Sequence, residues 1–129
     1  MGLTACRRPI KEPKEGTPLG KCVVITDATL CSMATDTLHL GGMQSGEQLL
    51  FRFHLQNQTE KPQVILGHEI TCGCIDLRYE NKPIMPSQYH PVEMRFDSRG
   101  LKGWQLKLFR LQLLDAEAPL TLFVEAEVE

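Results

Sequence analysis

The chain has 129 residues, of which 42% are hydrophobic and 23% are charged, and its formal net charge is -2. A chain of this length buries about two-thirds of its unfolded surface, which suits one domain with a core and excludes two large domains. The small net charge gives no general attraction for nucleic acid or an anionic membrane, and no stretch approaches the roughly 20 apolar residues of a transmembrane helix. The unusual feature is the set of five cysteines, because an odd number leaves one without a partner in the chain.

The first cysteine ends the sequence Leu3-Thr4-Ala5-Cys6, which is similar to the lipobox of a bacterial lipoprotein signal. We expect Cys6 to carry lipid; the alternative is an accidental four-residue match. Prolines, glycines and charges dominate residues 7–21, a composition that buries too little apolar surface to order itself. The sequence therefore predicts a disordered tether over residues 1–21 and a folded domain over residues 22–129.

From Cys22 onward the apolar residues recur with a period of two, which is the period of β-strands. Within 49–56, for example, Leu49, Phe51, Phe53 and Leu55 are expected in the core, and the residues between them are expected to face water. The pattern predicts extended segments over these ranges: 22–26, 37–40, 49–56, 64–66, 70–77, 92–96, 101–114 and 120–128.

About seven or eight short antiparallel strands, separated by turns and without a helical stretch, predict an all-β, immunoglobulin-like sandwich. One turn, Asn57-Gln58-Thr59, also matches the glycosylation sequon, although in a bacterial protein it would be a plain turn.

The order of several short motifs resembles the bacterial immunoglobulin-like family called domain of unknown function 1573, which is related to the Hydin-like domains. The resemblance covers roughly residues 37–128 and is most specific at Cys72-Gly73-Cys74. The motifs that carry it are Gly46-Glu47, Phe51-x-Phe53 to Asn57, Pro62 with Val64 to Leu66, Cys72-Gly73-Cys74, Ile84-Met85-Pro86, Phe96-Asp97, and Gly103 with Lys107.

Two departures from the family pattern are visible. Pro86-Ser87-Gln88 stands where the family usually has Pro-Gly-Glu, which implies a different turn geometry, and Asn57-Gln58-Thr59 replaces the usual Asn-x-Gly. The resemblance implies an exported protein or lipoprotein of Bacteroides-like bacteria. It implies no activity and brings no catalytic residues.

Cys72 and Cys74 are the foremost candidates for chemistry. In a regular strand their Cα atoms would lie about 6.6 Å apart, near the upper limit for a disulfide, so a bridge requires Gly73 to kink the backbone. Such a bridge would be easy to reduce, as thiol exchange requires; the alternative is a purely structural pair in an oxidising compartment. Cys22 and Cys31 either form a second bridge or remain two buried thiols.

A metal site is the less favoured interpretation. His68, Cys72, Cys74 and His90 supply imidazole and thiolate donors, which suit zinc or copper(I). A straight strand would hold His68 nearly 13 Å from Cys72, at about 3.3 Å per residue, so only a bend would bring them together. We therefore expect no cofactor.

Apolar residues occupy both faces of the strand that follows Gly103, and a half-buried strand cannot hide both without a bulge. We expect Trp104, Leu106 and Leu108, together with Phe123 of the last strand, to form an outer apolar patch that serves as a contact surface. The alternative is a bulge near Leu108 that returns these side chains to the core.

These features predict a non-enzymatic module of an exported, lipid-anchored bacterial envelope protein, located in the periplasm or outer membrane. We expect it to contact a protein or a glycan, to reach the membrane only through its lipid, and not to bind nucleic acid. Motifs of hydrolases, zinc proteases and nucleotide-binding enzymes are missing from the sequence. The alternative function is a periplasmic thiol-redox or copper- or zinc-binding protein that uses Cys72 and Cys74.

Overall fold

A computed structural model describes residues 21–31 and 34–129. The predicted lipid site at Cys6 and residues 1–20 of the predicted tether lie outside the described residues. The elements are β1 (Cys22–Ile25), α1 (Asp27–Cys31), β2 (Ala34–Met43), β3 (Gln48–Asn57), β4 (Ile65–Ile70), β5 (Ile75–Tyr79), β6 (Tyr89–Asp97), β7 (Gly103–Leu113) and β8 (Leu120–Val128). No helix among them is long and apolar enough to span a membrane.

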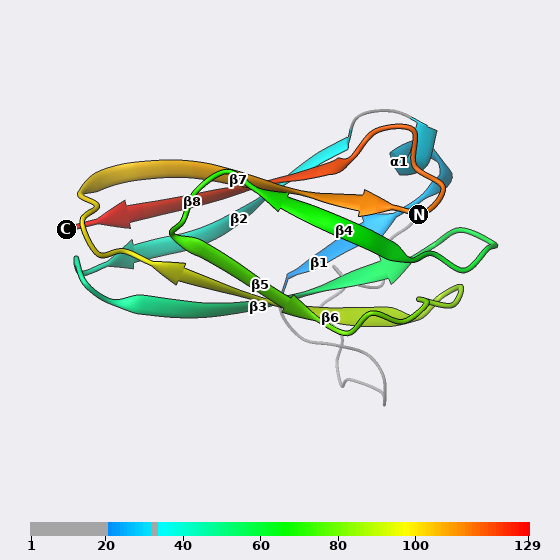
Figure 1. Cartoon of the computed structure of the whole chain (residues 1–129), viewed down its shortest axis with the longest axis horizontal. Helices are drawn as coiled ribbons and strands as arrows, with labels where there is room; N and C mark the ends of the chain where they lie inside the picture. Colours follow the sequence, from blue (N-terminus) through cyan, green and yellow to red (C-terminus); the bar gives the residue numbers. More distant parts are fainter. Residues whose placement is uncertain (1–20, 32–33) are drawn as a thin grey trace, which may run out of the picture.

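The eight strands form two four-stranded sheets that pack face to face (Figure 1). One sheet has the order β1-β3-β6-β5, and the other has the order β2-β8-β7-β4. The chain changes sheet between β4 and β5, so these two edge strands lie on the same side of the molecule (Figure 1). The predicted all-β sandwich is confirmed.

Two strand pairs are parallel, which corrects the prediction that all strands run antiparallel. β1 pairs in parallel with β3, and β2 pairs in parallel with β8. Both pairs arise because the chain alternates between the sheets at its start, so neither β1 nor β2 is joined to its neighbour by a hairpin. β2 is also longer than predicted, because a register shift between His39 and Gly41 lets its pairing with β8 continue to Met43.

The core lies between the sheets and is filled by alternate residues of the long strands. Phe53 of β3 and Phe109 of β7 are fully buried, and their ring centroids lie 6.3 Å apart across the sandwich. The inward positions of β8 are all buried, as the alternation predicts: Leu120, Leu122, Val124, Ala126 and Val128. On the outer face of β3 the prediction is wrong for Gln56, which is 6% exposed rather than facing water.

α1 was not predicted, although the residues that cap its N-terminus are present in the sequence. The Thr26 hydroxyl accepts the N–H of Thr29 at 3.2 Å, and the Thr29 hydroxyl accepts the N–H of Thr26 at the same distance. This reciprocal cap satisfies donors that a helix start leaves unpaired. With only five residues, α1 is too short to show a helical period.

Asn57 is fully buried at the end of β3 and makes hydrogen bonds with both ends of its amide. Its Nδ2 donates to the carbonyls of Lys61 and Ile84, each at 2.8 Å. Its Oδ1 accepts the N–H of Thr59 at 2.9 Å and the Thr59 hydroxyl at 2.7 Å. The sequon residue therefore ties two loops together, and its side chain is inaccessible to a glycosylating enzyme in the folded protein.

The turn at Pro86-Ser87-Gln88 keeps the geometry that a glycine would adopt. Ser87 has a φ of 72°, and it is the one non-glycine residue with positive φ among the described residues. Its N–H donates to the Asn57 carbonyl at 2.6 Å, and the Asn57 N–H donates to the Gln88 carbonyl at 3.1 Å. The expectation of a different turn geometry is wrong, because these two bonds to β3 hold the backbone in the left-handed region.

Candidate functional site

The predicted contact residues lie on the outer face of the sheet formed by β2, β8, β7 and β4. Trp104 is 57% exposed and Leu106 is 48% exposed, whereas Leu108 and Phe123 are half-buried and face each other across the β7–β8 pair. The register of this pair runs without a shift from Gly103 to Leu111, so the alternative of a bulge near Leu108 is not realised. Seven residues of β7, β8 and β2 on this face are here called the outer patch: Trp104, Leu106, Leu108, Phe123, His39, Glu125 and Glu127.

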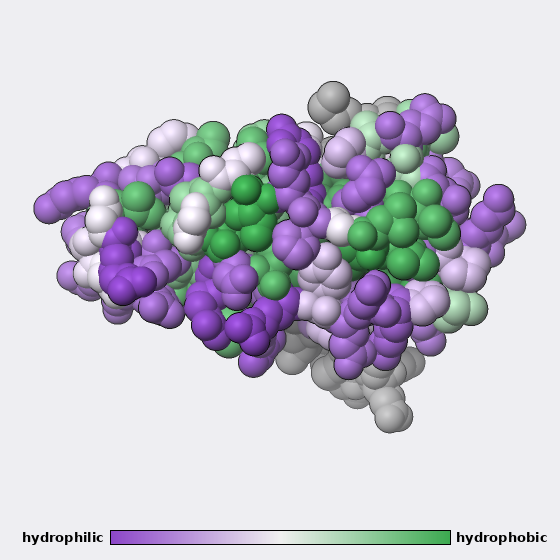
Figure 2. All heavy atoms as spheres, in the orientation of Figure 1, coloured by the Kyte–Doolittle hydropathy of each residue, from purple (hydrophilic) through white to green (hydrophobic). Residues whose placement is uncertain are grey.

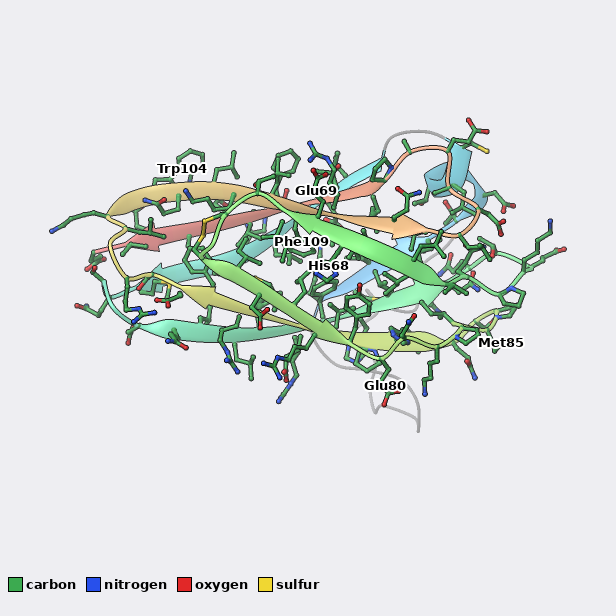
Figure 3. All side chains as sticks on the ribbon, viewed as in Figure 1. His68, Glu69, Glu80, Met85, Trp104 and Phe109 are labelled. Carbon is green, nitrogen blue, oxygen red and sulfur yellow. A yellow bond between two sulfur atoms is a disulfide. The ribbon has the colours of Figure 1, made fainter. Side chains whose placement is uncertain are left out.

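A chain of hydrogen bonds crosses three strands within the outer patch. The Trp104 Nε1–H of β7 donates to Glu125 Oε2 of β8 at 2.9 Å, and Glu125 Oε1 lies 2.6 Å from His39 Nδ1 of β2. The Trp104 bond, followed by the His39 bond, lowers the pKa of the Glu125 carboxyl below its usual value. The carboxylate accepts the indole N–H and so restrains the orientation of Trp104, which lies at the outer surface of β7 (Figure 3).

His39 was not predicted as a member of this surface. The alternation of β8 places Glu125 on the outer face, but only the parallel pairing of β2 with β8 puts His39 opposite it. Because the sequence predicts antiparallel pairs, it offers no signal for this contact.

Beyond Leu108, the same face continues to an ion pair between Arg110 of β7 and Glu69 of β4, whose charged atoms lie 3.3 Å apart. A shallow hollow of about 250 Å³ adjoins it, with Gln112 and Pro119 in its lining. The outer face of this sheet therefore has an apolar and acidic end near Trp104 and, beyond the outer patch, a mixed polar end near Arg110.

Cys72 and Cys74 are joined by a disulfide, and their Cα atoms lie 5.2 Å apart. The prediction of one extended segment over 70–77 is wrong, because β4 ends at Ile70 and the cysteines occupy the turn before β5. The turn is tied to β6 by the Asp97 N–H, which donates to the Cys74 carbonyl at 2.8 Å. Cys72 and Cys74 are therefore bridged rather than free.

The remaining metal-site candidates are not brought together. His68 Nδ1 lies 2.7 Å from the Tyr79 hydroxyl, on the side of the molecule where β4 and β5 form the edges (Figure 3). His90 is 2% exposed and its Nε2 lies 2.9 Å from the Glu80 carbonyl oxygen. Over residues 21–31 and 34–129, no three His, Cys, Asp or Glu side chains are grouped so that they could hold a metal ion.

Cys31 is an exposed free thiol at the end of α1, so the alternative of a bridge between Cys22 and Cys31 is not realised. The other alternative, two buried thiols, is also wrong, because Cys31 is exposed.

A second candidate site is a groove between the edge strands β4 and β5. On this side of the molecule, apolar residues gather in two places (Figure 2). The groove has a volume of about 480 Å³. Its lining residues are Ile65, Leu66, His68, Leu77, Arg78, Tyr79 and Asn81. Leu66 is 57% exposed because a register shift between Ile65 and Gly67 turns it out of the sheet.

His54 is half-buried on β3. Burial, followed by the charge of His90, lowers the pKa of the His54 imidazole below its usual value of 6.5. Its Nδ1 is buried and has no hydrogen-bond partner among the described residues. The neutral imidazole is therefore the form that this site favours.

Comparison with known proteins gives one family match. The model of the family described as "Protein of unknown function (DUF1573)" matches residues 31–128. No curated protein matches the chain.

Among solved structures, that of the VesB protease of Vibrio cholerae is similar, with a TM-score of 0.56 and 12% sequence identity. The match covers 72% of this chain and 30% of the protease chain, so it shows a shared fold alone. The structure of PbICP-C in complex with falcipain-2 has a TM-score of 0.37 to this chain and 11% sequence identity, over 85% of this chain and 100% of that chain.

Proposed function

The chain belongs to the DUF1573 family, and from this premise we propose that it is a non-enzymatic contact module of an exported, lipid-anchored bacterial envelope protein. The family description names no activity, so the proposal rests on the outer patch and on the Leu3-Thr4-Ala5-Cys6 sequence. The module contacts a protein or glycan in the periplasm or at the outer membrane. It reaches the membrane through lipid on Cys6 alone and does not bind nucleic acid.

The observation that supports contact is the exposure of Trp104 in a fixed orientation. The side chain is 57% exposed although its single polar atom is already bonded to Glu125. A tryptophan held in this way presents a large apolar surface and loses little conformational freedom when a partner covers it. Such aromatic side chains dominate the energetics of protein contacts.

The proposal is tested with a photo-crosslinking amino acid at position 106 in the full chain, expressed in its native bacterium. Leu50 provides the matched control, because it is a leucine of β3 in the other sheet, 44% exposed against 48% for Leu106. Crosslinked product from position 106 and little from position 50 supports the proposal. Equal yields at both positions, or none from position 106, contradict it.

The lipid anchor has its own test, which is metabolic labelling with a fatty-acid analogue followed by membrane fractionation. The expected result is label and membrane association in the natural chain and loss of both in Cys6→Ser. An unlabelled natural chain in the soluble fraction contradicts the anchor without affecting the contact surface.

A second candidate function, thiol exchange, is favoured by the disulfide between Cys72 and Cys74 in a surface turn. A dithiol partner would reduce it by thiolate attack on one sulfur, with two protons and two electrons passing to the cysteines while the partner becomes a disulfide. Alkylation followed by mass spectrometry, after equilibration with glutathione buffers and with added zinc or copper, tests this function. A bridge that resists reduction and binds no metal excludes it.

A further inference from the structure

We infer that the Trp104 end of the outer patch binds a lysine or arginine side chain of a protein partner, next to an apolar residue that covers Leu106. This inference deepens the proposed contact function and rests on it. It chooses between a protein and a glycan, and it names the chemistry that the partner presents.

The register of β7 and β8 places carboxylates beside the indole. Trp104 is opposite Glu127 and Leu106 is opposite Glu125, so acidic and apolar side chains alternate on one face. Residues directly opposite each other on antiparallel strands have Cβ atoms about 5 Å apart. A cation over the indole face is therefore within reach of both carboxylates.

No lysine or arginine among the described residues forms an ion pair with the carboxylates beside Trp104. Glu127 is exposed and belongs to none of the ion pairs formed by the described residues. Glu125 contacts His39, which carries charge only when protonated. Arg110, on the same face, is already paired with Glu69. A cation from outside would complete the local charge balance.

Aromatic and acidic groups together favour a cation over a sugar. Tryptophan is the best of the aromatic side chains for cation–π contact, and hydrogen bonds from a cation to a carboxylate are among the stronger ones. Both carboxylate oxygens of Glu125 already contact Trp104 and His39, so Glu127 is the carboxylate left to bind the cation directly, and the adjoining Leu106 is apolar. A glycan would need several directed polar contacts around the ring, whereas a cationic side chain with an apolar neighbour needs only those present here.

Trp104 is the single tryptophan of the chain, so its fluorescence and its indole N–H resonance report on this site alone. The experiment titrates the protein with the peptide acetyl-Leu-Lys-Leu-amide and with the matched neutral peptide acetyl-Leu-Gln-Leu-amide. Chitohexaose serves as the glycan probe. The variant is Glu127→Gln, and the matched control is Glu69→Gln, which removes a carboxylate from the same sheet face beside Arg110.

We expect the lysine peptide to bind saturably and about fivefold more tightly than the glutamine peptide. High salt should weaken the binding of the lysine peptide. Glu127→Gln should weaken it by a similar factor, and Glu69→Gln should leave it unchanged. Equal affinity for the two peptides, no binding of either, or equal effects of the two variants overturns the inference.

Failure of the inference is distinguishable from failure of the contact function. Binding of chitohexaose without preference for the lysine peptide overturns the cationic partner, but it leaves a glycan-contact module. The contact function itself fails only if the crosslinking comparison of positions 106 and 50 shows no difference.

Discussion

The indole nitrogen of Trp104 on β7 lies 2.9 Å from a carboxylate oxygen of Glu125, the diagonal neighbour on β8, whereas the residue directly opposite Trp104 is Glu127. Both residues lie on the face of the sheet that points away from the core. The hydrogen bond between them restrains two side chains that would otherwise rotate freely in water. His39 completes the arrangement from the parallel strand β2.

The pKa of Glu125 should rise toward its usual value of 4.5 in Trp104→Phe, because the largest cause of its lowering is the hydrogen bond from the indole. A carboxyl whose pKa is lowered by folding adds stability above its unfolded pKa, and this stability disappears as the pH falls through the folded pKa. As the pH falls below about 4.5, the free energy of unfolding should therefore decrease less in Trp104→Phe than in the natural chain.

Carbon-detected NMR of the carboxyl groups measures this change directly. Asp97 is the internal control, because hydrogen bonds from Arg99 lower its pKa and do not involve Trp104. An unchanged titration of Glu125 in Trp104→Phe would show that the indole does not hold the carboxylate.

Replacing Asn57 by alanine should lower the free energy of unfolding by about 3 kcal/mol, because the loss leaves buried groups without partners. The groups affected are the carbonyls of Lys61 and Ile84 and the polar atoms of Thr59. Urea denaturation measures the effect. Glu60→Ala in the same loop is exposed and should stay within about 0.5 kcal/mol of the natural chain; equal effects would contradict the role of Asn57.

Ser87→Gly should raise the free energy of unfolding by about 0.5–1 kcal/mol. The left-handed backbone at Ser87 costs a residue with a Cβ roughly 1–2 kcal/mol, and the greater freedom of unfolded glycine offsets part of the gain. Thermal denaturation of Ser87→Gly and Ser87→Ala gives the comparison. A stabilised alanine variant would refute the explanation, because alanine keeps the Cβ.

The disulfide between Cys72 and Cys74 should add little stability, because it closes a ring of only three residues. Loop-closure entropy gives about 1.6 kcal/mol for such a ring, so the double variant Cys72→Ala, Cys74→Ala should still fold. Alkylation without reductant should label the exposed Cys31 and leave Cys72 and Cys74 unlabelled. Labelling of either bridged cysteine under these conditions would contradict the bridge.

The alternation of apolar residues was sufficient to predict the sandwich and its core, because burial on one face of a strand imposes a period of two that β8 follows to Val128. Turn chemistry was harder to predict. The short ring at Cys72 and Cys74 forms in a turn rather than in a strand, and the left-handed Ser87 depends on bonds from β3, which lies far away in the sequence.

In the outer patch, too, some features could be predicted from the sequence and others could not. Trp104 and Leu106 were predicted to point outward, because an apolar strand with two apolar faces exposes one of them. Their hydrogen-bonded companions depend on which strands become neighbours. The pairing of β2 with β8 is parallel and brings together residues such as His39 and Glu125, which are 86 positions apart, and no local sequence pattern encodes it.

The parallel pairing of β2 with β8 determines how the domain would bear a pulling force. The N-terminal end of β2 lies beside the N-terminal end of β8, with Ala34 opposite Leu120 and Met43 opposite Val128. Tension between an anchor before β1 and a load after β8 would slide these strands along each other, so their inter-strand hydrogen bonds would share the load instead of breaking one at a time. Under such tension the domain would resist extension through its backbone, independently of the chemistry on the outer face of the sheet.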